Sequence, residues 1–376
     1  MNTDNLARDT DEEVVRRILI LTGGGDAPGL NAVLRAFVKT ATDLGLKVFG
    51  SEDGFAGLME EPTRVVPLTR EDVRGILPKG GSILGCSNRA NPFAYVERGA
   101  GGTERTVDLS ERVKAKLQEL EIDILVLVGG DGTMDIGMRF AKMGVSVVGI
   151  PKTIDNDLAA TDLTFGLDTA VGTATWAIDA LHSTAEAHDR VMILEVMGRD
   201  AGWIALLAGI AGGADVILIP EIHYDIDRIV DKIEARSPTG NSFSIVVVGE
   251  GAKPIGGTVS DITASHESIS QRQDGPGAQL AALLEARTDH EIRVTVLGHL
   301  QRSGSPSSFD RILGTRFGVH AAYLCYNDNT GQVVALKGQD IVSVPLEAAV
   351  ANLKRVPPDG ELVMVARTMG IELGEK

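Results

Sequence analysis

Two acidic turns near the middle of the chain carry the side chains best suited to chemistry. GGDGT at residues 129–133 presents Asp131, and PKTIDND at residues 151–157 presents Asp155 and Asp157. Carboxylates on neighbouring turns can divide two tasks, holding a metal ion and accepting a proton. A single Asp in such a place is more often a helix N-cap or a turn residue. Three aspartates in two neighbouring turns favour a shared site.

Further polar and cationic residues follow other predicted strands. The glycine-rich loop at residues 23–29 would let backbone approach a phosphate closely, although a tight turn without a ligand has the same composition. Two more loops carry Gly198-Arg199 and Glu250. This set suits phosphoryl transfer, in which cations stabilise the charge that develops on the transferred group. The cations that the sequence offers for it are Arg89, Arg190, Arg293, His299 and Arg302.

Other chemistries lack their motifs. The seven histidines show no close pairing and HExxH is absent, which argues against a histidine metal site. GxSxG, the local signature of an α/β-hydrolase, is also absent, as is the GxxxxGK[ST] P-loop. Taken alone, His299 would more often be a core or turn residue.

The elements that must position these residues alternate between strand and helix. Apolar runs rich in branched residues are typical of strands buried on both faces. The alternation predicts an α/β fold with two doubly wound, Rossmann-like parallel-sheet domains and the active site in the cleft between them. Strands are predicted at residues 17–22, 48–50, 124–128, 146–150, 190–197, 215–219, 242–248 and 293–297, and helices at 30–44, 109–120, 133–143, 170–186, 203–210, 224–235, 277–287 and 309–324.

Two stretches interrupt this alternation. Residues 95–108 are rich in glycine and charge and are predicted to form a surface loop, and residues 253–276 are predicted to be irregular. A few short strands and a helix near 346–353 are expected in the remainder.

Composition excludes several classes of protein. A chain of 376 residues is long for a single core, which favours two domains. The formal net charge of −16 argues against nucleic-acid binding, because there is no basic surplus to neutralise phosphates. The two cysteines, Cys86 and Cys325, predict no disulfide framework and a cytoplasmic location. The polar first 17 residues lack the core of a signal peptide, and no apolar run reaches the roughly 20 residues that span a membrane.

In its motifs the chain resembles the phosphofructokinase family. GGGDAPGLNAV, GGDGT, PKTIDND, EVMGR, the loop with Glu250 and GHLQRSGSP occur in that family's order between residues 17 and 318. GGDGT alone is shared with lipid and NAD kinases, whereas PKTIDND followed by MGR and GHxQR is specific. The resemblance implies phosphorylation of fructose 6-phosphate at its 1-hydroxyl, a step of glycolysis. It also implies a donor-binding domain of residues 1–165 with about 301–352, and a sugar-phosphate domain of 166–300 with about 353–376.

The resemblance further implies a role for each motif residue. Asp155 would be the base, with Lys152, Thr153 and Asp157 beside it. Arg199 would steady the transferred group. The phosphoryl donor would lie on Gly24, Gly25, Arg89, Gly130, Asp131, Gly132 and Thr133, with Mg²⁺ on Asp131. The sugar phosphate would be bound by Thr153, Asp155, Met197, Gly198, Arg199, Glu250, His299 and Arg302.

Two more of these residues imply self-association. Arg190 and Arg293 match arginines that the family supplies to the 6-phosphate from a neighbouring subunit. A homodimer or homotetramer is therefore expected.

The donor is the point on which the motifs disagree. Gly132 is typical of ATP users, because a side chain there would obstruct the nucleotide, whereas Lys152 is typical of pyrophosphate users. We favour ATP, because a steric obstruction is harder to evade than a spare charge. Glu52 stands near the place where short bacterial ATP enzymes present an aromatic residue to adenine, and the loop at 100–106 and the N-terminal extension are additional to the short form.

Three alternatives stay open at this point. The first is a pyrophosphate-dependent phosphotransferase acting on the same sugar. The second is an inactive sugar-phosphate sensor or regulatory subunit, which the presence of Asp131, Asp155, Asp157 and Arg199 disfavours. The third, a lipid or NAD kinase, leaves PKTIDND and GHLQRSGSP unexplained.

Overall fold

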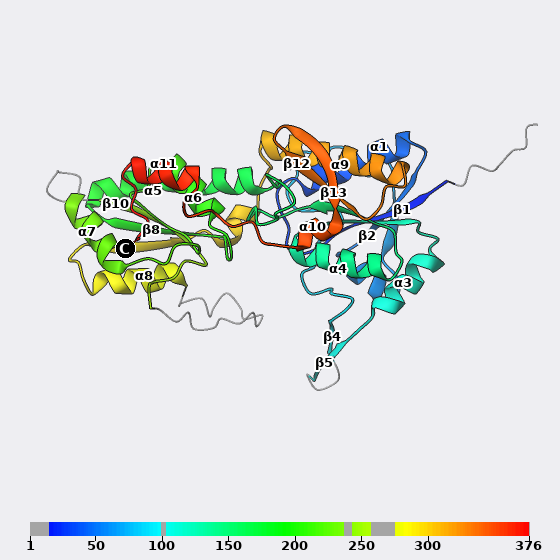
Figure 1. The fold of residues 1–376 in the computed structure, drawn as a ribbon, viewed down its shortest axis with the longest axis horizontal. Coiled ribbons are helices and arrows are strands. Elements are labelled where there is room, and N and C mark those ends of the chain that lie inside the picture. The colour runs from blue at the N-terminus through cyan, green and yellow to red at the C-terminus, as the bar shows by residue number, and fades with distance from the viewer. Residues whose placement is uncertain (1–14, 99–102, 237–242, 257–274, 376) are drawn as a thin grey trace, which may run out of the picture.

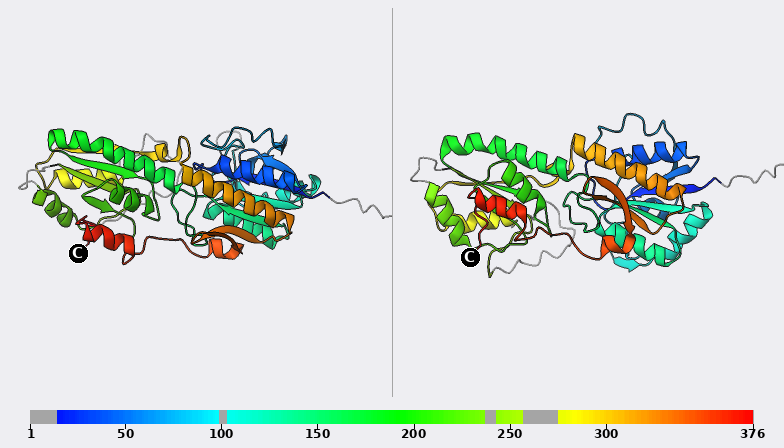
Figure 2. Two further views of the ribbon diagram at one scale, coloured as in Figure 1. Left: turned by 90° about the horizontal axis from the view of Figure 1, so that it is seen from above. Right: turned by 45° about the horizontal axis from the view of Figure 1, so that its top comes forward.

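Two lobes, each built on one sheet, make up the chain. The computed structural model describes residues 15–98, 103–236, 243–256 and 275–375. The lobes lie side by side along the long axis of the molecule, and helices cover both faces of each sheet (Figures 1 and 2). This arrangement confirms the predicted α/β class with doubly wound parallel sheets.

The larger sheet has seven strands and is mainly parallel. In spatial order these are β13 (Asp340–Pro345), β12 (Gln332–Lys337), β7 (Val147–Pro151), β6 (Ile124–Gly129), β1 (Arg17–Thr22), β2 (Lys47–Ser51) and β3 (Val65–Leu68). The five strands from β12 to β2 run parallel, and the edge strands β13 and β3 are antiparallel to their neighbours. Every residue of β6 and β7 is buried, as expected of strands covered on both faces.

The smaller sheet has four strands, all parallel. In spatial order these are β11 (Ile292–Val296), β8 (Val191–Val196), β10 (Ser244–Gly249) and β9 (Val216–Leu218). The central strands β8 and β10 are completely buried, whereas β11 lies at an edge and exposes Arg293, Val294 and Val296.

Two layers of helices bury each sheet. The larger sheet packs on one face against α1 (Leu30–Asp43) and α9 (Ser308–Tyr326), and on the other against α2 (Ala56–Met59), α3 (Ser110–Glu119), α4 (Asp131–Lys142) and α10 (Leu346–Val350). The smaller sheet packs against α5 (Leu167–His188), α6 (Trp203–Ala211) and α11 (Glu361–Thr368) on one face, and α7 (Ile226–Arg236) and α8 (Pro276–Glu285) on the other. No helix in the described part of the chain is both long and apolar enough to cross a membrane.

The structure corrects the sequence prediction at several places, among them the unpredicted helices α2 and α11. Residues 95–108, predicted to be a loop, contain the antiparallel hairpin of β4 (Tyr95–Arg98) and β5 (Glu104–Val107), which projects from the larger lobe (Figure 1). Glu97 and Arg105, which carry opposite charges, face each other across the two strands. The charged residues that favoured a loop are therefore compatible with a hairpin. The antiparallel strand β3 was also not predicted.

Several predicted segments lie outside the described residues. They are residues 1–14 of the N-terminal extension, residues 100–102 of the loop at 100–106, and residues 257–274 of the segment predicted to be irregular.

Helices α1 and α9 approach closely because two glycines of α9 face the backbone of α1. A Cβ added at Gly318 would lie 2.5 Å from the carbonyl oxygen of Val33, and one added at Gly314 would lie 3.0 Å from that of Gly29. Since Gly29 directly precedes α1 and lies in the loop after β1, this packing sets the position of that loop.

Gly318→Ala should therefore destabilise the larger lobe. The added methyl group cannot fit without moving the helices apart, and overpacking of this kind costs about 1–3 kcal/mol. Gly172→Ala in α5 is the matched control, since a Cβ there meets no atom within 4 Å and alanine favours a helix. Chemical denaturation of both variants measures the effect. Equal free energies of unfolding for Gly318→Ala and the wild type would contradict this account of the packing.

Candidate active site

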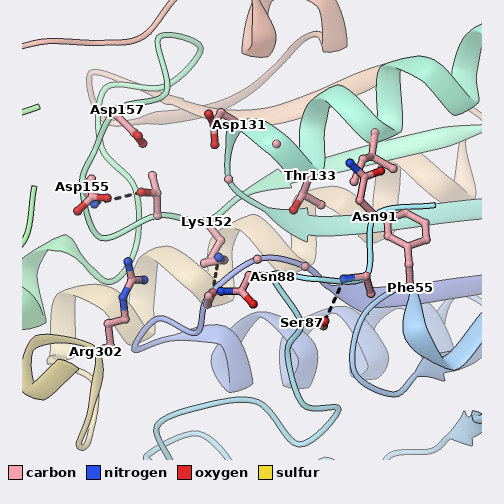
Figure 3. Close-up of a pocket in the computed structure, with 18 residues that line it drawn as sticks. Phe55, Ser87, Asn88, Asn91, Asp131, Thr133, Lys152, Asp155, Asp157 and Arg302 are labelled. Atoms are coloured by element: carbon pink, nitrogen blue, oxygen red, sulfur yellow. Dashed lines mark hydrogen bonds between the residues drawn. The ribbon is translucent and has the colours of Figure 1, made fainter. Parts of the chain in front are cut away.

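A cavity of about 300 Å³ lies where the central strands of the larger sheet end. Its walls come from the residues that follow β1, β2, β6 and β7, together with the loop at 87–91 and Arg302 of the 3-10 helix η3 (Gly298–Arg302) (Figure 3). The two acidic turns predicted to face one crevice do so, because β6 and β7 are adjacent parallel strands.

The first turn of α4 forms one wall of this cavity. Helix α4 begins at Asp131, directly after β6, so its first backbone N–H groups have no partner within the helix and can bind an anion. Thr133 packs its side chain against the ends of β1 and β6. A Cβ at Gly129 would lie 2.3 Å from that of Thr133, and one at Gly23 would lie 2.6 Å from its hydroxyl oxygen. Both positions therefore require glycine, because the Thr133 side chain leaves no room for a Cβ atom.

The second turn places two carboxylates on the opposite wall. The backbone N–H of Asp155 donates a hydrogen bond to Thr153 Oγ1 at 3.1 Å, and Asn156 has a positive φ of 53°. Asp155 and Asp157 each have one buried carboxylate oxygen without a hydrogen-bond partner among the described residues. Such oxygens are expected to bind a proton, a cation or a ligand.

Burial controls the acidity of this turn. It raises the pKa of Asp155 to about 7, and the negative charges of Asp157 and Glu250 add to the rise, while Arg302 and Lys152 oppose it. A carboxylate with this pKa can accept a proton at neutral pH.

The two acidic turns supply carboxylates of the kind that bind a metal ion. The pKa of Asp157 is raised first by burial and then by the negative charge of Asp131, so these two carboxylates lie close together. Mg²⁺ prefers carboxylate oxygens and commonly takes one or two of them, with phosphate and water completing its shell. Within the described residues no three His, Cys, Asp or Glu side chains converge as a metal-binding group. The donor set therefore suits a metal that arrives with a phosphate.

Two cations border the glycine loop. The Lys152 side chain is 3% exposed, and its ammonium donates a hydrogen bond to the carbonyl oxygen of Gly25. Burial, with a smaller contribution from the charge of Arg302, lowers the pKa of Lys152 to about 8. Arg302 Nη1 donates to the carbonyl oxygen of Asp26 at 2.9 Å. Figure 3 shows Lys152, Arg302 and Asp155 at the same end of the cavity.

The residues from the smaller sheet meet beside the cavity. The backbone N–H of Met197 donates to Gln301 Oε1 at 3.3 Å, and that of Glu250 donates to the carbonyl oxygen of Val196 at 2.9 Å. Thus the loop after β8 lies against η3, and the loop after β10 lies against the end of β8. Of the residues predicted to bind the sugar phosphate, Thr153, Asp155 and Arg302 line the cavity, whereas Met197, Gly198, Arg199, Glu250 and His299 do not.

Three predicted arginines lie elsewhere in this single chain. Arg190 lies just before β8 and Arg293 lies on β11, both away from the cavity. Both pair with Glu291, whose carboxylate lies 2.9 Å from Arg190 Nε. Arg89 is exposed and does not line the cavity, although Asn88 and Ala90 do.

The sequence prediction missed the other end of the cavity. Phe55, Asn91 and Ile136 line it there. Glu52, which the sequence places near the position of the adenine-packing aromatic of short bacterial enzymes, does not. Phe55 is held by the Phe140 ring, whose centroid lies 5.6 Å away. The available signal was positional: Phe55 follows the end of β2, which is adjacent to β1 in the same sheet.

Comparison with known proteins identifies the family. The model of the family described as Phosphofructokinase matches residues 17–325. The chain belongs to the phosphofructokinase family. The ATP-dependent 6-phosphofructokinase of Chloroflexus aurantiacus is 50% identical over 366 residues, covering 96% of this chain and 98% of that one. The pyrophosphate–fructose 6-phosphate 1-phosphotransferase of Streptomyces coelicolor is 49% identical over 348 residues, covering 91% and 96%.

A solved structure has the same fold. The phosphofructokinase of Saccharomyces cerevisiae superimposes with a TM-score of 0.72 at 29% identity. The match covers 94% of this chain and 46% of the yeast chain, so the chain spans about half the length of that relative.

Proposed function

We propose that this protein is a 6-phosphofructokinase, which transfers the γ-phosphoryl group of ATP to the 1-hydroxyl of fructose 6-phosphate to give fructose 1,6-bisphosphate. The observation that carries the proposal is the single cavity in which a carboxylate with a pKa of about 7, Asp155, faces the first turn of α4 and the carboxylate of Asp131. A proton acceptor and a phosphate site are the two components that phosphoryl transfer to an alcohol needs.

The residues of the cavity divide the work of this reaction. The backbone N–H groups of α4 and the loop with Gly24 and Gly25 would bind the donor phosphates. Asp131 would hold Mg²⁺, which supplies charge neutralisation on those phosphates when bound. Asp155 would accept the proton of the sugar hydroxyl, and its buried, unpartnered oxygen favours that role.

The cations have separate roles in the proposal. Lys152 and Arg302, both close to the glycine loop, would stabilise the charge of the transferred group. Arg199, from the loop after β8, would reach that group from the other lobe. Met197, Gly198, Glu250 and His299 would bind the sugar phosphate from the same side.

The shape of the cavity supports ATP as the donor. The named relatives include both ATP and pyrophosphate users at almost equal identity. Beyond Thr133, however, the cavity continues to the apolar side chains of Phe55 and Ile136. Pyrophosphate has no apolar group that could contact them. A Cβ at Gly132 would meet no atom within 4 Å, so this glycine leaves open space on the path of a nucleotide. The pyrophosphate-dependent reaction is the second candidate because Lys152 offers a cation there.

Self-association would bring the missing arginines to the site. Val294 and Val296 on β11, close in sequence to Arg293, and Trp176 on α5 expose apolar side chains, which favour contact with a second copy. In a homodimer or homotetramer, Arg190 and Arg293 would reach the 6-phosphate of the neighbouring subunit.

Both cysteines are free thiols, which supports a cytoplasmic location.

Asp155→Asn should lower kcat by about 10²–10⁴, because the amide cannot accept a proton. The KM values for both substrates should change little, since the amide has nearly the same shape. Steady-state assays with ATP and fructose 6-phosphate measure this. The control is Asp231→Asn, an exposed position on α7. A kcat within tenfold of wild type would exclude Asp155 as the base.

The pH profile should report the same carboxylate. Because a base must be unprotonated and the pKa of Asp155 is raised to about 7, kcat/KM should fall about tenfold per pH unit below that value. Above pH 7 the rate should level off. The residual activity of Asp155→Asn should no longer fall as the pH is lowered below 7. An unchanged fall in the variant would assign this pH dependence to another group.

Gly132→Asp should separate the two donors. An acidic side chain in the open space beside Gly132 would obstruct and repel a nucleotide, lowering kcat/KM for ATP by roughly tenfold or more, equivalent to about 1.4 kcal/mol. Turnover with pyrophosphate, assayed in parallel on both proteins, is the reference. Wild-type turnover with pyrophosphate alone would replace the first candidate by the second, and turnover with neither donor would exclude both.

A further inference from the structure

The chain passes behind the second acidic turn on its way between the lobes. After α10 in the larger lobe, residues 351–360 lead to α11 in the smaller lobe. Leu353 forms an isolated bridge with Leu158, and the backbone N–H of Lys354 donates to the carbonyl oxygen of Asp157 at 2.7 Å. This crossing segment thus touches the turn without lining the cavity.

The Lys354 ammonium uses all of its donors on the turn and on the residues that follow it. Nζ lies 3.0 Å from Asn156 Oδ1, 3.0 Å from the carbonyl oxygen of Thr161 and 2.5 Å from that of Asp162. Asn156 is the residue of positive φ between the two carboxylates, and its Oδ1 also accepts a hydrogen bond from the backbone N–H of Thr164. One side chain therefore fixes the conformation that separates Asp155 from Asp157.

The same residue is anchored to the smaller lobe. Trp203 Nε1 donates to the carbonyl oxygen of Lys354 at 3.1 Å, and the ammonium lies 5.6 Å from the centre of the Trp203 ring. Nearby, the carboxylate of Glu221 accepts hydrogen bonds from the backbone N–H groups of Gly202 and Val356. Gly202 ends the loop after β8 that contains Arg199, and Trp203 is the first residue of α6.

We propose that Lys354 is a positioning residue, which holds the acidic turn of residues 155–157 at a fixed place relative to the loop of residues 199–203 from the other lobe. The proposal rests on the function proposed above for Asp155 and Arg199. Lys354 does not line the cavity and acts only through the backbone and side chain of its neighbours. Without the ammonium, three oxygen acceptors each lose one donor, and the turn gains freedom.

This role predicts a specific kinetic result. A displacement of about 1 Å at a reacting group can cost on the order of 10²-fold in rate. The proposed donor-binding residues follow β1 and β6 and have no contact with Lys354, so donor binding should be retained. Lys354→Met, which keeps the length of the side chain but removes its donors, should therefore lower kcat by roughly 10²-fold and leave the KM for the donor within about threefold.

Lys337→Met is the matched control. Lys337 pairs with Asp162 at 3.2 Å, close to the same acceptors, but it is exposed and does not contact the turn. Its kinetic constants should stay near those of the wild type. Trp203→Phe provides a milder variant, because it keeps a ring over the ammonium and removes only the hydrogen bond to Lys354. Its kcat should fall in the same direction by a smaller factor.

Hydrogen exchange followed by mass spectrometry gives a readout that does not depend on activity. Backbone amides in a peptide covering residues 152–164 should exchange faster in Lys354→Met than in the wild type or Lys337→Met, while peptides of α1 and β6 exchange alike. A folded Lys354→Met with wild-type kcat and unchanged exchange would overturn the proposal, and so would a uniform rise of exchange throughout the chain. If the wild type transfers phosphate from neither donor, the proposed function fails, and the exchange result still decides whether Lys354 fixes the turn.

Discussion

The carboxylates of Asp155 and Asp157 are largely buried, and the rest of the site depends on the free energy that this burial costs. A buried charge without compensation costs several kcal/mol, so such groups normally pair or bind a proton. Here the raised pKa of Asp155 shows that compensation is incomplete. The cations of Lys152 and Arg302 oppose the rise in the pKa of Asp155. One buried oxygen of each carboxylate has no hydrogen-bond partner among the described residues, which leaves both acids available to a ligand.

This electrostatic arrangement depends on the parallel sheet. Because β1, β6 and β7 are adjacent and run in the same direction, the glycine loop, the first turn of α4 and the acidic turn all emerge at one edge. The glycines that follow β1 and β6 allow Thr133 to pack against the strand ends, which brings the N-terminus of α4 to the cavity. A phosphate site and a proton acceptor thus become neighbours through strand order alone.

The second lobe contributes through contacts that cross between the sheets. Arg302 reaches the carbonyl oxygen of Asp26, Gln301 binds the backbone of Met197, and Lys354 joins the acidic turn to Trp203. These contacts come from chain segments more than 100 residues apart. They give the two lobes a defined relation at the cavity, where the proposed acceptor and donor must meet in line.

Local features of the sequence determined the motifs, the strand and helix periods and the class of fold, because each depends on residues that are close in the chain. The same features placed Asp131 and Asp155 at one edge of the sheet, since each lies in a turn that follows a predicted parallel strand, whereas Lys152 was singled out only through the resemblance to the family. Only the tertiary structure decided that Phe55 and not Glu52 lines the cavity, that Glu291 pairs with Arg190 and Arg293, and that Lys354 supports the acidic turn. Those outcomes depend on which distant segments pack together, and no periodicity or spacing within one segment specifies its partner.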